Sequence, residues 1–382
     1  ATPAPSGSGA IFLGISNFVN GKLNLSPSNI RYISEEDFAQ GSVRFVIGLA
    51  KKVLLANVLG EFTQEIAGMT GGFRGCLGRR MALMRPDEGV VDYRFLYYYM
   101  FSPAWREEVE RYKVNGSTVD RIPLVSFPSF RVDLPNMRTQ KAIADILFAI
   151  DQKIDSNSRV NDNLEQQAEL LYHERFETID RDKLPVGWRI VRLGDVATIS
   201  KKSFNPAKEP EMLLEHYSIP AFDEAHFPVF EPSTAIKSNK FIVDDSCFMI
   251  SKLNPTTKRV WKPYCLTENA VCSTEFIVYK AKSQEITDFL YSVIDSASFS
   301  DFMCSHVTGS TGSRQRTTPS DTLAFELVLP NAEEIAEYQG IVSPMLEQIK
   351  CNTIENDRLK RLRDSLLPKL MSGEIDVSDI QL

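Results

Sequence analysis

The sequence predicts an α+β protein in which two similar α/β blocks are separated by two long helices that form a coiled coil. Three observations lead to this prediction. The chain repeats itself, each copy ends in one long helical pattern with a heptad seam, and the better-defined block mixes strand and helix patterns. A chain of 382 residues is long enough for two or three domains.

The repeat is clearest where the two helices begin. FRVDLPNMRTQ in the first half is matched by FELVLPNAEEI 195 residues later, and the same offset pairs Asn157 with Asn352. It also pairs Asn161 with Asn356. Upstream, VNGST is matched by VTGST, and FLY occurs in both copies. Four matches in one order indicate a duplicated unit of one block plus one helix.

Both helices carry the spacing of a coiled-coil strand. From Arg138 to about Phe176 apolar residues alternate spacings of three and four, over about 60 Å of helix. The second helix keeps this rhythm, although Arg363 interrupts it once, and Gly373 is expected to close it. Two separate surface helices are the alternative, but helices of this length favour packing on each other.

Asparagines occupy four seam positions, where apolar residues are expected. A buried polar residue at such a position lowers stability but fixes the register of the helices. In an antiparallel pair the first two asparagines would lie close to the second two. We therefore expect a register-fixing set, which consists of Asn157, Asn161, Asn352 and Asn356.

The second block shows alternating strand and helix patterns. LPVGWRIVRLGDVATIS predicts a strand and a turn with a short helix at Leu193 to Val196, and FIVDDSCFMISKLNP and AVCSTEFIVYKAK predict strands. DFLYSVIDSASFSDFM has helical spacing. The predicted segments are a first block (1–131), a first long helix (132–185), a second block (186–328) and a second long helix (329–382).

The most apolar stretch, from Val43 to Gly60, is near the length of a membrane span. Lys51 and Lys52 lie at its centre, where charge is costly in lipid, so a buried or amphipathic helix is expected and no membrane partner. The opening ATPAPSGSG lacks the charged and apolar parts of a signal peptide. Six scattered cysteines without a CxxC pair indicate a reducing, cytoplasmic setting.

Charge is distributed unevenly, although the net charge of −7 argues against unspecific coating of nucleic acid. Windows 66–86, 246–267 and 302–320 contain no Asp or Glu. Solvated loops are the alternative for any one window, but windows in both copies favour contacts to phosphates and base edges. The candidate nucleic-acid-binding residues are Arg79, Arg80, Ser117, Arg121, Lys252, Asn254, Lys258, Arg259, Lys262, Thr311, Arg314 and Arg316.

Motifs for catalysis are not found in the sequence. The four histidines are dispersed, and GSTGSRQRT lacks the GK[ST] ending of a phosphate loop. Neither a methyltransferase, a nuclease nor a helicase motif is present. We therefore expect a binding protein with no catalytic residues, no metal site and no cofactor of its own.

The order of these motifs resembles the specificity subunit of type I restriction-modification enzymes. The resemblance rests on LPNMRTQKAIADILFAIDQKID, LPVGWRIVRLGDVATIS, ISKLNPTTKRVW, STEFIVY, VTGSTGSRQRT and DRLKRLRDSLLPKLMSGEIDV. It implies two target recognition domains that each read one half of a split double-stranded DNA sequence, with the two long helices packed antiparallel as a coiled-coil spacer. Neutralising Lys258 and Arg259 is then expected to weaken DNA binding and its dependence on salt.

The resemblance also implies partners that carry the chemistry. Two methyltransferase subunits would bind S-adenosylmethionine and methylate adenine, and two restriction subunits that use ATP and Mg²⁺ can join them.

A coiled-coil scaffold that binds only proteins is the leading alternative, and a fragment of a membrane-bound acyltransferase, suggested by Val43 to Gly60, is another. The first block departs from the family in two ways: it lacks the opening strand, and residues 41–66 replace a strand hairpin.

Overall fold

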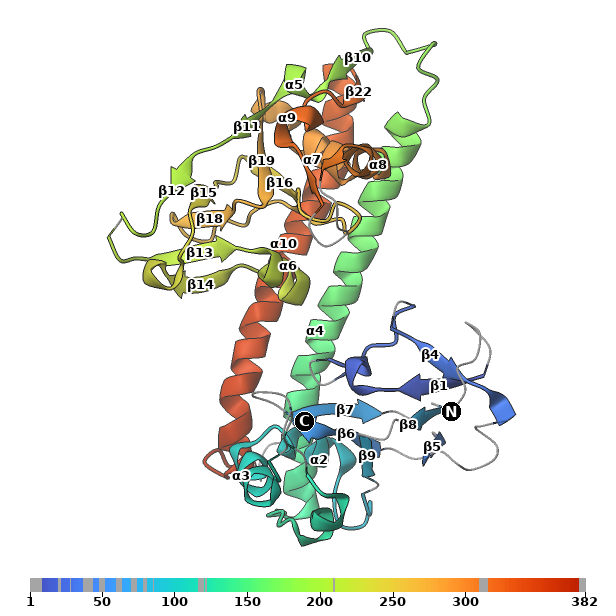
Figure 1. Ribbon diagram of the computed structural model, residues 1–382, viewed down its shortest axis with the longest axis vertical. Helices are drawn as coiled ribbons and strands as arrows, with labels where there is room; N and C mark the ends of the chain where they lie inside the picture. Colours follow the sequence, from blue (N-terminus) through green and yellow to red (C-terminus); the bar gives the residue numbers. More distant parts are fainter. Residues whose placement is uncertain are drawn as a thin grey trace. The chain divides into compact units, whose positions relative to one another are not determined.

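A computed structural model describes residues 9–19, 22–27, 29–36, 44–47, 52–59, 64–69, 74–77, 81–84, 86–115, 120, 122–208, 210–308 and 315–377. The chain divides into two compact units, one formed by Ala1–Lys153 with Leu359–Leu382 and the other by Ile154–Arg358. Two long helices, α4 (Met137–Tyr172) and α10 (Ala332–Met371), contribute residues to both units (Figure 1). The predicted mixed fold with two long helices is confirmed.

The two long helices begin in the same way. The Asn136 side chain accepts a hydrogen bond from the Thr139 amide at 3.0 Å, and the Asn331 side chain accepts one from the Glu334 amide at 2.9 Å. Asparagine caps a helix because its side-chain oxygen satisfies an amide that has no partner within the helix. The two caps stand at the offset that the sequence repeat predicts, so the duplication extends to local structure.

The predicted ends of the helices are also found. Beyond Tyr172, α4 continues into the π-helical turn η3 (His173–Glu177), close to the expected end at Phe176. After α10, Gly373 adopts a φ of 75°, and its amide donates to the Leu370 carbonyl at 3.3 Å. A left-handed residue of this kind ends a helix with little strain only when it is glycine.

The first unit combines small sheets with helices. Its sheets have the strand orders β4-β1-β8-β5, β7-β6-β9 and β2-β3. The elements are β1 (Ala10–Leu13), η1 (Ile15–Asn17), β2 (Phe18–Val19), β3 (Lys22–Leu23), β4 (Arg31–Ile33), β5 (Arg44–Ile47), β6 (Lys52–Leu59), β7 (Gln64–Met69), β8 (Arg74–Leu77), β9 (Met81–Met84), α2 (Tyr93–Tyr99), α3 (Pro103–Tyr112) and η2 (Leu124–Ser129).

The prediction of a helix from Val43 to Gly60 is wrong. Strands β5 and β6 occupy this stretch, and β6 pairs antiparallel with both β7 and β9. The run KVLLANVL was assigned from its apolar length alone, which does not distinguish a buried strand from a helix. Strands β6 and β7 therefore form an antiparallel pair in this part of the chain.

The core of the first unit is shared with the long helices. Phe95 of α2 and Trp105 of α3 pack with Ile143 and Leu147 of α4 and with Leu370 of α10. All five side chains are buried. Each long helix therefore supplies one face of this core.

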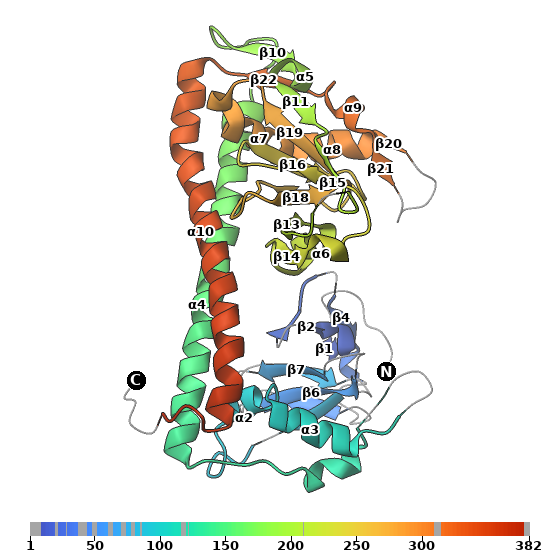
Figure 2. The same cartoon turned by 90° about the vertical axis from the view of Figure 1, so that its left-hand side faces the viewer.

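The second unit contains two larger sheets, with the strand orders β11-β19-β16-β17 and β12-β15-β18-β13-β14, and the pairs β10-β22 and β20-β21 (Figure 2). Its elements are β10 (Arg189–Arg192), α5 (Leu193–Val196), β11 (Ala197–Ser200), β12 (Ser203–Phe204), β13 (Leu213–Tyr217), α6 (Ile219–Ala225), β14 (Val229–Pro232), η4 (Ser233–Ala235), β15 (Lys240–Ile242), β16 (Cys247–Ser251), β17 (Val260–Trp261), β18 (Ala270–Ser273), β19 (Phe276–Ala281), η5 (Gln284–Ile286), α7 (Thr287–Asp295), α8 (Ala297–Ser305), β20 (Val307–Thr308), β21 (Arg316–Thr317), α9 (Pro319–Thr322) and β22 (Glu326–Leu329).

The predictions for the second block are confirmed. Strand β10, helix α5 and strand β11 follow one another through LPVGWRIVRLGDVATIS, and α5 has the expected bounds. The predicted strands are β15, β16, β18 and β19, and the helical run is divided into α7 and α8. Ser296 separates these two helices and caps α8 by accepting from the Phe299 amide at 3.2 Å.

Helix α7 lies between the first sheet of this unit and the long helices. Its Phe289 and Val293 are fully buried, together with Tyr279 of β19 and Tyr338 of α10. Tyr172 of α4 belongs to the same core. Because α7 contacts both sides, it connects the sheet to the helix pair.

Candidate nucleic-acid interface

Two of the windows without acidic residues meet in the second unit. The 252–259 loop joins β16 to β17, and it contacts the hairpin of β20 and β21 through an isolated bridge between Leu253 and Arg316. The Asn254 amide donates to the Gln315 carbonyl at 3.0 Å, and the Thr317 amide donates to the Lys252 carbonyl at 3.1 Å. Segments that the sequence analysis treated separately therefore form one surface.

Asn254 has an unusual conformation at the tip of this loop. Its φ of 49° is left-handed, a region in which asparagine is the most tolerated residue after glycine. The Thr257 amide donates to its carbonyl at 2.9 Å and closes the turn. The side-chain Oδ1 is buried and has no hydrogen-bond partner among the described residues.

Arg316 forms a two-pronged ion pair with Glu275, which lies between β18 and β19. Its Nε is 3.0 Å from Oε2, and its Nη2 is 3.0 Å from Oε1. The carboxylate raises the pKa of the guanidinium. Because both partners are planar, the pair fixes the orientation of the Arg316 side chain at the surface of the hairpin.

Arg259, at the other end of the loop, is paired in the same way. Its Nε lies 2.6 Å from Oδ1 of Asp223, and its Nη2 lies 2.9 Å from Oδ2. Asp223 belongs to α6. The Arg259 side chain is 12% exposed, so it lies mostly below the surface and is held by an acidic residue from another element.

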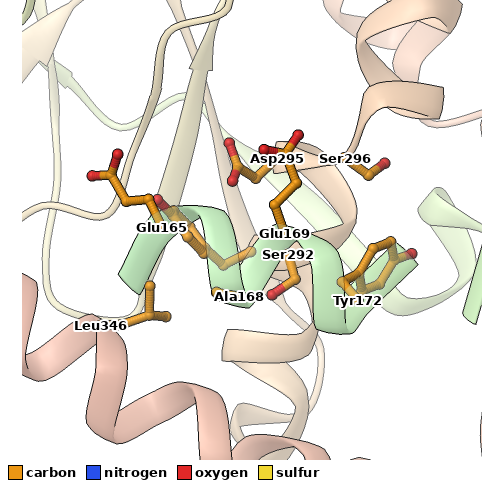
Figure 3. Close-up of a pocket in the computed structure, with 9 residues that line it drawn as sticks. Glu165, Ala168, Glu169, Tyr172, Ser292, Asp295, Ser296 and Leu346 are labelled. Carbon is orange, nitrogen blue, oxygen red and sulfur yellow. The ribbon is translucent and has the colours of Figure 1, made fainter. Parts of the chain in front are cut away.

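Lys258 points to the helices. Its Nζ is 3.2 Å from Oε1 of Glu169 in α4, 3.1 Å from Oδ1 of Asp295 at the end of α7, and 2.9 Å from the Asp295 carbonyl. Burial disfavours its charge, but the two carboxylates outweigh this and raise the pKa of Lys258. Glu169 and Asp295 also line a small pocket between α4 and α7. Figure 3 shows their carboxylates side by side there, with Glu165 on the same helix as Glu169.

Lys262, which follows β17, is also directed towards a helix, in this case α7. Its ammonium forms an ion pair with Asp288 at the start of α7, and the Ser343 hydroxyl of α10 donates to Oδ2 of Asp288 at 2.5 Å. Gln339 of α10 accepts from the Asp288 and Phe289 amides at 3.1 Å each. The first turn of α7 is therefore tied to α10.

The remaining candidates divide into two groups. Lys252 is half-buried beside the hairpin, and its amide donates to the Glu275 carbonyl at 2.9 Å. The others lie outside the described residues, namely Arg79, Arg80, Ser117, Arg121, Thr311 and Arg314. Of the described candidates, the structure brings Lys252, Asn254 and Arg316 together and directs Lys258 and Lys262 towards the helices.

The carboxylates of this region were missed in the sequence. Windows without Asp and Glu along the chain cannot show acidic residues that approach through space from other elements. Sequence proximity gives a signal only for Glu275, which follows β18 in the STEF motif. The missed residues are Glu169, Asp223, Glu275, Asp288 and Asp295.

Two further findings concern metals and membranes. Within the described ranges, no group of three or more His, Cys, Asp or Glu side chains is arranged to hold a metal ion. None of the helices in the described part of the chain is both long and apolar enough to cross a bilayer.

Comparison with known proteins supports a single family. A family model described as "Type I restriction modification DNA specificity domain" matches residues 9–166, which cover most of the first block and much of α4. The chain is 23% identical over 321 residues to the MjaIX type I restriction enzyme specificity subunit of Methanocaldococcus jannaschii, covering 77% of this chain and 72% of that protein. It is also 23% identical over 376 residues to the HindI specificity subunit of Haemophilus influenzae, covering 78% and 80%.

A solved structure shares the fold. The type I restriction-modification S subunit from M. genitalium matches with a TM-score of 0.56 and 16% identity, over 95% of this chain and 92% of that one. The repeated unit, the paired long helices, the family model and the curated relatives agree. The chain is thus similar to type I restriction-modification specificity subunits over most of its length.

Proposed function

We propose that this chain reads a split double-stranded DNA target, one half with each block, and positions two adenine methyltransferase subunits on it. The observation that carries the proposal is the meeting of the 252–259 loop with the β20-β21 hairpin. Two segments rich in donors and free of carboxylates come together there. DNA-reading surfaces need this composition, because phosphates and most base edges in the major groove accept hydrogen bonds.

The side chains at this junction suit different parts of DNA. Lys252 can neutralise a phosphate, Asn254 can pair with adenine, and Arg316 has the fork geometry that recognises guanine. Thr311 and Arg314, which lie between Thr308 and Gln315 in the sequence, complete the proposed contact set of the second block. In the first block the proposed contacts are Arg79, Arg80, Ser117 and Arg121.

In this proposal the partner subunits carry out the catalysis. The relatives are named specificity subunits of restriction enzymes, and the sequence offers no catalytic motif of its own. S-adenosylmethionine would bind to the methyltransferase subunits, and ATP and Mg²⁺ to restriction subunits where these are present. The long helices are the proposed docking element, since they are continuous through both units.

Mapping methylated adenines in cells tests the proposal. Cells that express this chain with its methyltransferase partner should acquire methylation at one motif with two defined halves and a fixed gap. A strain with the methyltransferase alone is the control. Methylation that does not change when this chain is omitted would contradict the proposal, and a motif with one half only would limit reading to one block.

A further inference from the structure

Lys258 lies at the point where the 252–259 loop reaches the long helices. One end of the loop is held at the hairpin by the hydrogen bond from the Asn254 amide to Gln315. Only Pro255, Thr256 and Thr257 separate Asn254 from Lys258. The loop therefore spans a short distance along the chain between the proposed DNA surface and α4.

The ammonium of Lys258 already has partners within the chain: it donates two hydrogen bonds and forms an ion pair with a second carboxylate. A lysine ammonium has three N–H donors. Three acceptors of the chain lie within 3.2 Å of its Nζ, namely Oε1 of Glu169, Oδ1 of Asp295 and the Asp295 carbonyl. A phosphate bound to this ammonium would lie next to the carboxylates of Glu169 and Asp295.

The surroundings of Lys258 are acidic overall. Glu165 lies one helical turn from Glu169 on α4 and lines the same pocket as Asp295 (Figure 3). Two carboxylates contact the ammonium, and the third belongs to the lining of the same pocket. Since like charges repel at short range, this environment disfavours a DNA phosphate and favours retention of the lysine.

We propose that Lys258 is a positioning residue that holds the reading loop at a fixed place on the spacer helix. It connects the loop to α4 through Glu169 and to the end of α7 through Asp295. The loop and its Asn254 are then presented at one angle to the helix. This inference rests on the proposed function, since a reading surface must exist before its position can matter.

Binding measurements on the full chain in its complex with the methyltransferase subunits test the inference. The probes are a duplex that carries the mapped target and a duplex of equal length without it. The variants are Lys258→Met, Lys258→Arg and Glu169→Gln, with Lys252→Met as the comparison for loss of a proposed phosphate contact. Each is titrated at several salt concentrations.

A positioning role predicts a specific pattern. Lys258→Met and Glu169→Gln should each weaken binding to the target duplex by roughly 2- to 30-fold and leave the unspecific duplex unaffected. Their salt slopes should equal that of the unchanged protein, while Lys252→Met should reduce the slope by about 0.9, the value for one phosphate. Lys258→Arg should retain most of the affinity, because it can still bridge the two carboxylates.

Other outcomes would overturn the inference. If Lys258→Met reduces the salt slope and Glu169→Gln does not weaken binding, Lys258 is a phosphate ligand. If both variants bind like the unchanged protein, the ion pairs have no positioning role. Glu169→Gln is informative even if the lysine variant fails to fold, since Glu169 is a partly exposed residue of α4. If the unchanged complex does not prefer the target duplex, the proposed function itself fails.

Discussion

Asn157 of α4 donates a hydrogen bond to Asn356 of α10 inside the helix seam, with Nδ2 and Oδ1 3.0 Å apart. One helical turn further along α4, Asn161 accepts from Asn352 at 2.8 Å. As residue numbers rise along α4 they fall along α10, so the helices are antiparallel in this unit. The expectation that these four asparagines lie together is confirmed.

Replacing all four asparagines with leucine tests whether they fix the register. A slide of one heptad moves one helix against the other by about 10 Å, roughly three base pairs of DNA. The amides are satisfied in the observed register, whereas leucines pack in several registers. We expect the variant to methylate targets with more than one gap length, which methylation mapping can detect.

The control for this variant is Asn163→Leu, which changes an exposed asparagine of the same helix. It should leave the gap between the two half-targets unchanged. A single gap length in the fourfold variant would show that other contacts determine the register.

Seam periodicity predicted these asparagine contacts but did not identify the partner of Arg363. A heptad pattern gives the face on which a residue lies, and this placed the asparagines correctly. Arg363 was interpreted as an interruption of the seam. In the structure its Nη1 is 2.8 Å from Oδ1 of Asp151 on α4, and the buried Tyr98 hydroxyl donates to Oδ2 at 2.7 Å. Pairing across helices depends on register, which periodicity alone does not give.

Substituting Arg363 with leucine separates the two interpretations. A purely apolar seam predicts that leucine stabilises the first unit, whereas the ion pair predicts destabilisation by about 1 kcal/mol, since both groups are partly exposed. Urea unfolding measures the free energy. In a double-mutant cycle with Asp151→Asn the two changes should not be additive, and Arg358→Leu, an exposed arginine of α10, serves as control.

The proposed DNA surface was predictable in composition but not in geometry. Two runs without acidic residues, the 252–259 loop and the hairpin, were predicted to have the same role, and the structure brings them into contact. The direction of each side chain depends on elements distant in the chain. Lys258 points to α4 and Lys262 to α7 because Glu169 and Asp288 lie there, and no local pattern encodes those approaches.

Glu165, in the pocket that also contains Glu169 and Asp295, makes the stability of the fold depend on pH. The enclosing pocket, followed by the Asp295 and Asp162 carboxylates, raises the pKa of Glu165 to about 7, although Lys258 opposes this. The folded pKa lies above the ordinary value of 4.5, so the folded state retains a proton between these values that the unfolded state has released. This contribution to stability is complete below 4.5 and is lost as the pH rises through about 7.

Glu165→Gln should therefore reduce the fall in stability between about pH 5 and about pH 8. Denaturant midpoints of the unchanged protein and the variant at both pH values measure the difference. Glu174→Gln removes an exposed carboxylate near the end of the same helix and is the matched control. Equal pH dependence in all three proteins would show that Glu165 titrates normally.

Glu275 is predicted to orient Arg316 for base reading. Removing a carboxylate next to DNA lowers repulsion, so a simple charge effect would make Glu275→Gln bind every duplex more tightly. An orienting role predicts the opposite for the target. Glutamine cannot hold the guanidinium at both oxygens, so Arg316 loses its fixed plane, and one base pair loses about 1–3 kcal/mol of discrimination.

The measurement compares Glu275→Gln with the unchanged complex on the target duplex and on duplexes that carry one substituted base pair. Discrimination should fall at one position and persist at the others, because each fork-shaped contact reads one base pair. Arg316→Lys should lose discrimination at the same position, since lysine keeps the charge but lacks the planar fork. Asp223→Asn breaks the analogous pair of the mostly buried Arg259 and should leave that position unaffected. Loss at different positions for Glu275→Gln and Arg316→Lys would mean that the two residues act separately.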